Sequence, residues 1–234
     1  MAEHYWRGPV EDEVMQDEHG FIWLAMLEMT DTPLSGRKAL DIGCNRGGFL
    51  RLLVDRADIG SGFGYDPAAG AIKDARRLAG ARPLTFEVAE TVPDDWSDFD
   101  VAFSHEVLYV LHDLASHAAA VFAALGAGGS YFATMGVHAD SSLMVGWHSE
   151  KAIELDLPGP YRLDDVADIF EVAGFDVAVG RLPMRFVPVH AHRGDSHRDT
   201  ALSSWLDYYY RDKVMFRFTK RAPVNGSGGS VGAG

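Results

Sequence analysis

The chain has 234 residues, 47% of them hydrophobic, which suits one large α/β domain with a sizeable core. Its net charge of −13 repels phosphate backbones, so a nucleic acid is disfavoured as substrate. A small acidic substrate stays open, because local charge can oppose the overall sign.

The N-terminal region predicts a buried helix. Residues 1–14 lack the basic start and the long apolar stretch of a signal peptide. The apolar run at 21–27, FIWLAML, is too short to span a bilayer. Residues 11–29 are expected to form a helix whose early acidic residues suit its dipole. We therefore expect a soluble, cytoplasmic protein that does not bind a membrane.

Residues 38–135 alternate between strand and helix patterns. Short apolar runs predict strands at 38–43, 60–66, 83–88, 99–104 and 130–135. Helical spacing predicts helices at 49–56, 68–78 and 115–125, the last stopping at the glycine-rich stretch 126–129. This alternation predicts a doubly wound α/β fold with a parallel sheet, whose ligands bind beyond the carboxyl ends of the strands.

The last third of the chain follows another order. Its patterns predict a helix at 164–173, a strand at 175–180, a helix at 203–210 and a final strand at 213–220. The glycine-rich end predicts a flexible tail. We divide the chain into an N-terminal helical segment (1–36), a main domain (37–222) and the tail (223–234).

The glycine-rich segment DIGCNRGG, at 41–48, follows the first predicted strand. A dinucleotide-binding fingerprint, G-x-G-x-x-G, needs its middle glycine for close approach to a pyrophosphate, and Asn45 stands there instead. This disfavours a nicotinamide dehydrogenase. Asn45 tolerates left-handed backbone geometry better than most residues. Cys44, the single cysteine, forms no intramolecular disulfide and is expected to be a small packing residue.

The same segment resembles motif I of the class I S-adenosylmethionine-dependent methyltransferases, D/E-x-G-x-G-x-G, with Asn45 in place of the middle glycine. The resemblance implies a seven-stranded, mostly parallel sheet with helices on both faces and an antiparallel last strand. It also implies that the backbone of Gly43, Asn45 and Gly47 holds the amino-acid part of the cofactor. Asp41 is then close to the ammonium group or orders the loop.

Three further positions fall where this family needs them. Asp66 ends the second strand, where a carboxylate suits both ribose hydroxyls, although it also suits the N-cap of the next helix. Glu90 follows the third strand, where the resemblance implies a contact with the adenine amino group; the alternative is a solvated acid. Ser104 ends the fourth strand and is expected to bind the cofactor.

The segment 104–113, SHEVLYVLHD, resembles small-molecule methyltransferases and lacks the N/D-P-P-[YFW] signature of enzymes acting on bases or glutamine. Methyl transfer mainly needs positioning, and a general base helps only where the nucleophile carries a proton. The candidate bases are three histidines at or after strand ends: His105, His138 and His148. Structural roles for each of them stay open.

Acceptor contacts are expected from two places. The resemblance implies that the N-terminus folds over the site as a lid, which makes Tyr5 and Trp6 candidates. The other candidates follow the fourth and fifth strands: Glu106, Tyr109 and Trp147. A cluster at 190–197, VHAHRGDSH, makes a metal site conceivable, but its arginines argue against one, and we expect no metal.

These features predict an S-adenosylmethionine-dependent methyltransferase acting on an O, N or C atom of a small molecule in specialised metabolism. Two alternatives stay open. The enzyme would use the aminocarboxypropyl arm of the cofactor and release methylthioadenosine, or the chain would bind the cofactor without chemistry. A homodimer is also left open.

Overall fold

The structure is a computed structural model that describes residues 9–189 and 201–221. Tyr5, Trp6, the histidine-rich segment 190–197 and the expected tail lie outside these residues. Within the described part, no helix combines the length and apolar character that crossing a bilayer requires.

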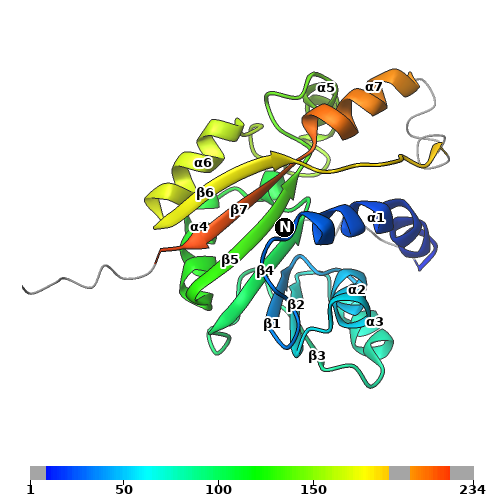
Figure 1. Cartoon of the computed structure of the whole chain (residues 1–234). Coiled ribbons are helices and arrows are strands. Elements are labelled where there is room, and N and C mark those ends of the chain that lie inside the picture. The colour runs from blue at the N-terminus through cyan, green and yellow to red at the C-terminus, as the bar shows by residue number, and fades with distance from the viewer. Residues whose placement is uncertain (1–8, 190–200, 222–234) are drawn as a thin grey trace, which may run out of the picture.

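Seven strands form one sheet. They are β1 (Lys38–Ile42), β2 (Ser61–Asp66), β3 (Leu84–Val88), β4 (Phe99–His105), β5 (Leu125–Met135), β6 (Phe175–Arg181) and β7 (Val214–Lys220). The spatial order is β3-β2-β1-β4-β5-β7-β6. The strands from β3 to β5 in this order run parallel, while β7 pairs antiparallel with β5 and β6. The predicted sheet, with an antiparallel last strand, is confirmed (Figure 1).

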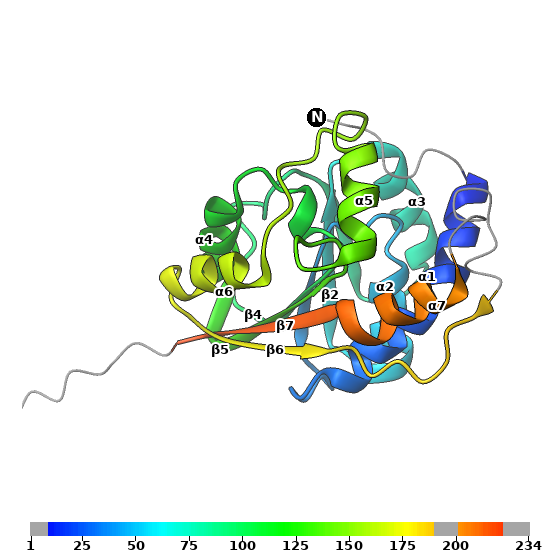
Figure 2. The same cartoon turned by 90° about the horizontal axis from the view of Figure 1, so that it is seen from above.

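Helices surround this sheet. They are α1 (Pro9–Met29), α2 (Gly48–Ala57), α3 (Ala69–Ala79), α4 (Leu114–Ala124), α5 (Ser142–Lys151), α6 (Leu163–Val172) and α7 (Leu202–Asp207). A 3₁₀ turn, η1 (Leu108–Val110), follows β4, and a π-helical turn, η3 (Tyr208–Asp212), joins α7 to β7. Figure 2 shows α4 and α6 grouped together, away from α1, α2 and α3.

The alternation of side chains along β4 separates the two faces of the sheet. Phe103 meets Phe49 of α2, with their ring centroids 5.1 Å apart. Ser104 points the other way, toward Tyr131 of β5, which packs in turn against Phe170 of α6. His105, two residues after Phe103, is therefore expected on the α2 face, and its hydrogen bond to Trp23 of α1 agrees.

Helix α4 ends at Ala124, next to the predicted stop, but the glycines at 126–129 do not cap it and the predicted strand start at 130 is wrong. Strand β5 begins at Leu125 and runs through these glycines, with a register shift against β4 between Phe99 and Val101. A Cβ atom at Gly129 would lie 2.9 Å from the carbonyl oxygen of Phe99. Glycine therefore permits close strand pairing here instead of ending the preceding helix.

Helix α5 is also absent from the sequence prediction, which left this segment as a loop. The Ser141 side chain accepts a hydrogen bond from the Met144 N–H (3.4 Å) at its N-terminus. The apolar residues of this helix are spread around its circumference, so helical periodicity did not mark it.

Candidate functional site

The loop between β1 and α2 is held in left-handed backbone conformations. The φ angles are +69° at Gly43, +46° at Asn45 and +70° at Gly47. A Cβ at Gly43 would lie 2.7 Å from Val107, and one at Gly47 would lie 2.5 Å from Phe86. The two glycines therefore let neighbouring side chains close on the loop, in addition to permitting its turn.

Asp66, at the end of β2, ties this loop to the sheet. One carboxylate oxygen accepts from the Asn45 N–H (3.0 Å) and the other from the Ala68 N–H (2.8 Å). The N-cap of α3 is Ala68, so the N-cap role considered for Asp66 is wrong. Burial raises the pKa of Asp66, and its two backbone hydrogen bonds oppose that rise. Each oxygen keeps a lone pair, so the predicted ribose contact is chemically available.

Two more acidic residues, Asp41 and Glu90, lie toward the carboxyl ends of neighbouring strands. Asp41 in β1 is buried, and its burial together with the nearby charge of Asp66 raises its pKa well above 3.8. Glu90 is exposed just after β3, next to Ala89, whose N–H donates to the Asp66 carbonyl oxygen (3.2 Å). The structure therefore brings the predicted cofactor residues to the carboxyl ends of β1, β2 and β3.

Ser104 is placed differently from these residues. Its hydroxyl is fully buried and lies 2.7 Å from the Tyr131 hydroxyl, which is 3.2 Å from Nε2 of His117. Burial lowers the pKa of His117 to about 4, so this imidazole is neutral at neutral pH. The Ser104 side chain is thus part of an internal network on the α4 face.

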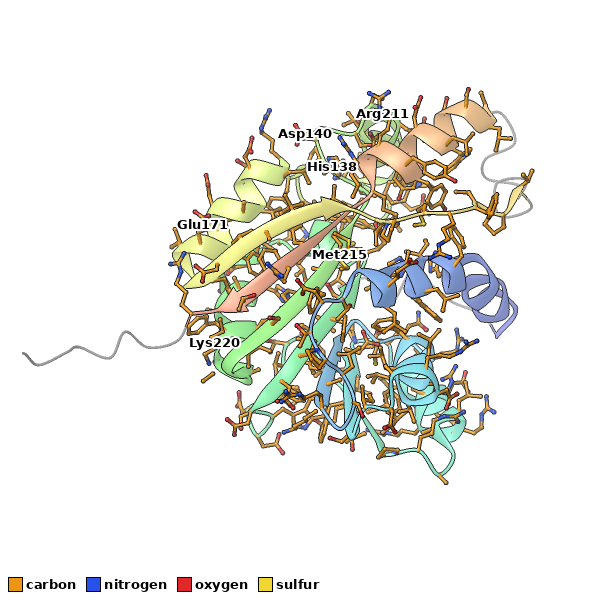
Figure 3. All side chains as sticks on the ribbon, viewed as in Figure 1. His138, Asp140, Glu171, Arg211, Met215 and Lys220 are labelled. Atoms are coloured by element: carbon orange, nitrogen blue, oxygen red, sulfur yellow. The ribbon has the colours of Figure 1, made fainter. Side chains whose placement is uncertain are left out.

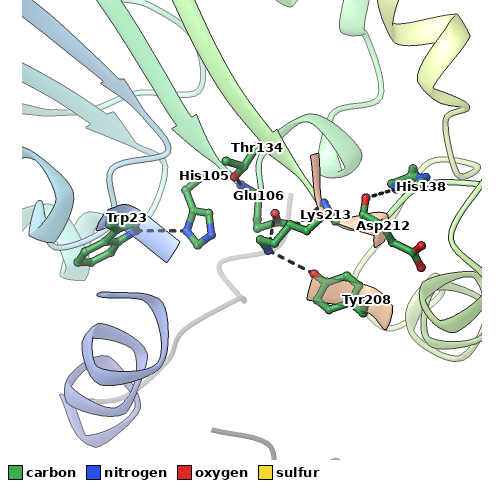
Figure 4. A network of polar contacts seen from close by, with 9 residues as sticks. Trp23, His105, Glu106, Thr134, His138, Tyr208, Asp212 and Lys213 are labelled. Atoms are coloured by element: carbon green, nitrogen blue, oxygen red, sulfur yellow. Dashed lines mark hydrogen bonds and ion pairs between the residues drawn. The ribbon is translucent and has the colours of Figure 1, made fainter. Parts of the chain in front are cut away.

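A second group of polar side chains gathers where β4 ends, and we call it the β4-end cluster: Trp23, His105, Glu106, Tyr208 and Lys213 (Figure 4). The Trp23 Nε1–H donates to His105 Nδ1 (3.3 Å). The Glu106 carboxylate accepts from the Gly136 N–H (3.1 Å) and lies 2.9 Å from Lys213 Nζ. Lys213 also donates to the Tyr208 hydroxyl (3.3 Å). The cluster joins α1, β4, η3 and β7.

Charge in the β4-end cluster is concentrated in one buried ion pair. The Lys213 side chain is 3% exposed and that of Glu106 is 16% exposed. Burial and the Lys213 charge lower the pKa of the neighbouring His19 to about 4, against an opposing effect of Glu106. Burial, His19 and Lys213 lower the pKa of His105 well below 6.5. Both imidazoles are therefore neutral at neutral pH.

The other two predicted histidines donate to backbone carbonyls. His138 Nε2 lies 2.8 Å from the Asp212 carbonyl oxygen, which connects the loop after β5 to η3. His148 Nε2 lies 2.7 Å from the Pro158 carbonyl oxygen. A carbonyl only accepts, so each of the two rings carries a hydrogen on Nε2. Figure 3 shows His138 near the junction of α7 and β7, with Lys220 at the opposite end of β7.

Tyr109 and Trp147 meet edge to face, with ring centroids 6.3 Å apart. Their contact joins η1 to α5. Glu106 is the predicted acceptor-side residue that enters the cluster together with His105. The roles of all these residues in binding stay predictions.

Sequence reasoning missed Trp23, Tyr208 and Lys213. A lysine directly before the apolar run Val214–Phe216 was the available signal for Lys213. Within the described residues, no group of three or more His, Cys, Asp or Glu side chains is arranged to hold a metal ion.

Residues 40–131, which run from β1 into β5, match the family described as "Methyltransferase domain". Residues 40–131 therefore form a methyltransferase domain, and the sheet as a whole has the class I methyltransferase fold. The protein is therefore an enzyme, with S-adenosylmethionine as its cofactor. No curated protein matches the sequence.

Solved structures resemble this methyltransferase in fold. A chain from a complex between the Haloferax volcanii Trm112 methyltransferase activator and a methyltransferase has a TM-score of 0.77 at 19% identity, over 91% of this chain and 95% of that chain. Haemonchus contortus phosphoethanolamine N-methyltransferase 2, bound to phosphomonomethylethanolamine and S-adenosylhomocysteine, has a TM-score of 0.69 at 18% identity, over 91% and 57%. A geranyl diphosphate methyltransferase bound to SAM has a TM-score of 0.70 at 16% identity, over 92% and 91%.

The residues of the glycine loop fit this cofactor. Asn45 Oδ1 is buried and has no hydrogen-bond partner among the described residues. A buried acceptor without a partner suits an ammonium group, which only donates. The Asn45 side-chain oxygen thus offers the methyltransferase an acceptor for the cationic methionine end. The backbone N–H of the same residue donates to the Asp66 carboxylate (3.0 Å), which is predicted to take the ribose.

Proposed function

We propose that this methyltransferase transfers the methyl group of S-adenosylmethionine to a small-molecule acceptor in the cytoplasm, within specialised metabolism. The observation that carries the proposal is the joined pair of Asn45 and Asp66. The Asp66 carboxylate holds the Asn45 N–H at 3.0 Å, while the Asn45 side-chain oxygen stays buried without a partner. This arrangement supplies hydrogen-bond acceptors for the methionine end and for the ribose of one cofactor.

The cofactor contacts follow from this pair. Asn45 Oδ1 and the backbone at Gly43 and Gly47 are proposed to receive the methionine end, with Asp41 close by. Asp66 takes the ribose and Glu90 the adenine amino group. When bound, S-adenosylmethionine supplies an electrophilic methyl group on a sulfonium. The chain itself binds, orients and excludes water, which is most of what this reaction needs.

The net charge of the chain and the names of two structural neighbours support a small acceptor molecule. The net charge of −13 opposes a nucleic acid partner. The two neighbours with substrates in their names, phosphoethanolamine and geranyl diphosphate methyltransferases, act on small molecules by those names. Helix α1 carries Trp23 to His105 and is proposed to cover the acceptor together with the rest of the segment 1–36.

His138 is the proposed general base for an acceptor that carries a proton. Its Nε2–H is engaged by the Asp212 carbonyl, which leaves the lone pair on Nδ1. That Nδ1 atom is buried and has no hydrogen-bond partner among the described residues. His148 has the same tautomer and is kept as a second candidate base.

The test combines calorimetry with product analysis. We expect S-adenosylmethionine to bind and to be converted into S-adenosylhomocysteine with at least one member of a broad acceptor panel. Release of methylthioadenosine would contradict methyl transfer and favour use of the aminocarboxypropyl arm. Tight binding without any turnover would favour a binding module.

A further inference from the structure

The hydrogen bond between Trp23 and His105 fixes which nitrogen of His105 carries the proton. An indole N–H only donates, so Nδ1 of His105, 3.3 Å from Trp23 Nε1, must be the acceptor. A neutral imidazole has one N–H, and that hydrogen is therefore on Nε2. In this tautomer Nε2 is a donor and has no lone pair with which to remove a proton.

Among the described residues, no acceptor pairs with the Nε2–H of His105, and this nitrogen is buried. The ring of His19 stands perpendicular to the ring of His105, with centroids 4.8 Å apart. A buried donor without a partner is unfavourable, so its place at the carboxyl end of β4 points to a ligand acceptor atom.

Glu106, the acid of the β4-end cluster, is engaged by two other partners. One Glu106 oxygen takes the Gly136 N–H and the other faces Lys213 Nζ at 2.9 Å. The Lys213 ammonium is felt electrostatically at both His19 and His105. A ligand at this point thus meets one N–H donor beside the Glu106–Lys213 ion pair, and such a donor bonds most strongly to an anionic oxygen.

We propose that the acceptor substrate is a carboxylate, that His105 binds one of its oxygens through Nε2–H, and that Trp23 is a positioning residue that holds His105 in this tautomer. The inference rests on the proposed methyl transfer. The second carboxylate oxygen attacks the methyl carbon, and the carbon–sulfur bond breaks with its electron pair left on sulfur. The products are a methyl ester and S-adenosylhomocysteine, and no proton needs to be removed.

The Trp23 ring packs against residues at the end of the glycine loop. A Cβ at Gly48 would lie 2.6 Å from the Trp23 ring, and Phe49 packs beside that ring with centroids 6.1 Å apart. Gly48 therefore provides the space in which the indole reaches His105. The loop that is proposed to bind the cofactor also sets the tautomer on the acceptor side.

The first measurement is independent of turnover. Long-range ¹H–¹⁵N correlation spectra of the full chain at pH 7 should give His105 a protonated Nε2 and an unprotonated Nδ1. In Trp23→Phe, which keeps an aromatic ring but removes the donor, we expect a mixture of both tautomers. A protonated Nδ1 in the wild-type protein, or an unchanged tautomer in Trp23→Phe, would overturn the positioning role.

The second measurement compares two variants on a matched panel. Benzoic and short aliphatic acids, with the corresponding amides, alcohols and amines, are tested with S-adenosylmethionine. His105→Gln keeps an N–H donor but cannot act as a base, so we expect kcat/KM for the acids to stay within about five-fold. His105→Leu should lower it about 10- to 100-fold, mainly through KM, the effect of losing one hydrogen bond to a charged group.

The outcomes separate this inference from the proposed function. Equal losses in His105→Gln and His105→Leu would identify a proton-removing role and overturn it. Methylation of amines or alcohols but not acids would also overturn it, while leaving methyl transfer intact. Bound cofactor with no turnover of any panel member would count against the proposed function itself. A loss of S-adenosylhomocysteine affinity in His105→Leu, measured by calorimetry, would reassign His105 to the cofactor and overturn the inference.

Discussion

The proposed cofactor side and the proposed acceptor side of this methyltransferase are built in different ways. On the cofactor side, Asp66 accepts the backbone N–H of Asn45, which follows the neighbouring parallel strand. On the acceptor side, Glu106 is held by Lys213, which lies far along the chain between η3 and β7. The first arrangement depends on local backbone shape, and the second depends on side chains that meet only after the whole sheet has formed.

This difference predicts different costs of mutation. A change on the cofactor side should alter ligand affinity and leave most of the fold intact. A change in the β4-end cluster should alter stability first, because it holds a buried charge pair. The following experiments test this difference.

The largest effect is expected from Lys213→Met. It leaves the Glu106 carboxylate without its cation in a buried place, which should cost about 3–5 kcal/mol of unfolding free energy. Denaturant unfolding measures it. The double variant Glu106→Gln/Lys213→Met should recover much of the loss, and Lys73→Met, at an exposed lysine of α3, should change stability little. If Lys213→Met behaves like Lys73→Met, the cluster does not support the fold.

A smaller effect, on affinity, is expected from Asp66→Ala. Losing hydrogen bonds to a carboxylate should weaken S-adenosylmethionine binding by about 1.5–3 kcal/mol, as measured by calorimetry. Glu87→Ala, at an exposed acid in the neighbouring strand β3, is the matched control and should bind normally. Unchanged affinity in a folded Asp66→Ala protein would remove Asp66 from the site.

Asp41→Asn is expected to change the pH dependence of stability. The folded-state pKa of Asp41 is raised well above 3.8, so its contribution to stability is fully present below pH 3.8 and is lost as the pH rises through the raised value. Asp41→Asn removes this loss and should be more stable than the wild-type protein at pH 8, with the gap closing toward acid pH. Thermal unfolding across pH measures the gap.

The same Asp41→Asn variant should bind S-adenosylmethionine less tightly, because a carboxylate near the ammonium is lost. Stability and affinity would then move in opposite directions at neutral pH. A variant that binds normally and shows a gap independent of pH would contradict both the burial of this charge and its place beside the cofactor.

The smallest effect is expected from Glu90→Gln. Glu90 is exposed, so a hydrogen bond to the adenine amino group should be worth about 1 kcal/mol or less. Calorimetry at matched ionic strength should show a weakening of a few fold. An affinity equal to that of the wild-type protein would make Glu90 a solvated acid.

The arrangement of the glycine loop and Asp66 could be predicted from the sequence because its determinants are local. Asp41 lies in one strand, Gly43 and Asn45 follow it directly, and Asp66 ends the next strand, so their meeting follows from parallel pairing alone. The family resemblance supplied their roles, which stay predictions. The left-handed φ of Asn45 was also predictable, since asparagine tolerates that conformation.

The acceptor side could be predicted only in part. His105 and Glu106 were found because they end a strand, but nothing local indicates that Trp23 or Lys213 will contact them. The base role first considered for His105 depends on a tautomer that only the Trp23 contact decides. Strand β5 escaped prediction at Gly126–Gly129 because the same residue type serves both helix ends and close strand pairing.

The π-helical turn η3 has a consequence for how this enzyme tolerates insertions and deletions. The Lys213 N–H bonds to the Tyr208 carbonyl at 2.8 Å, so residues five apart stand above one another and the ammonium also reaches the Tyr208 hydroxyl. An α-helix pairs residues four apart, and a π-turn is an α-helix with one residue added. Deleting a single residue within 209–212 would therefore rotate Lys213 by about 100° and turn it away from Glu106. The length of this turn therefore determines whether Lys213 faces Glu106.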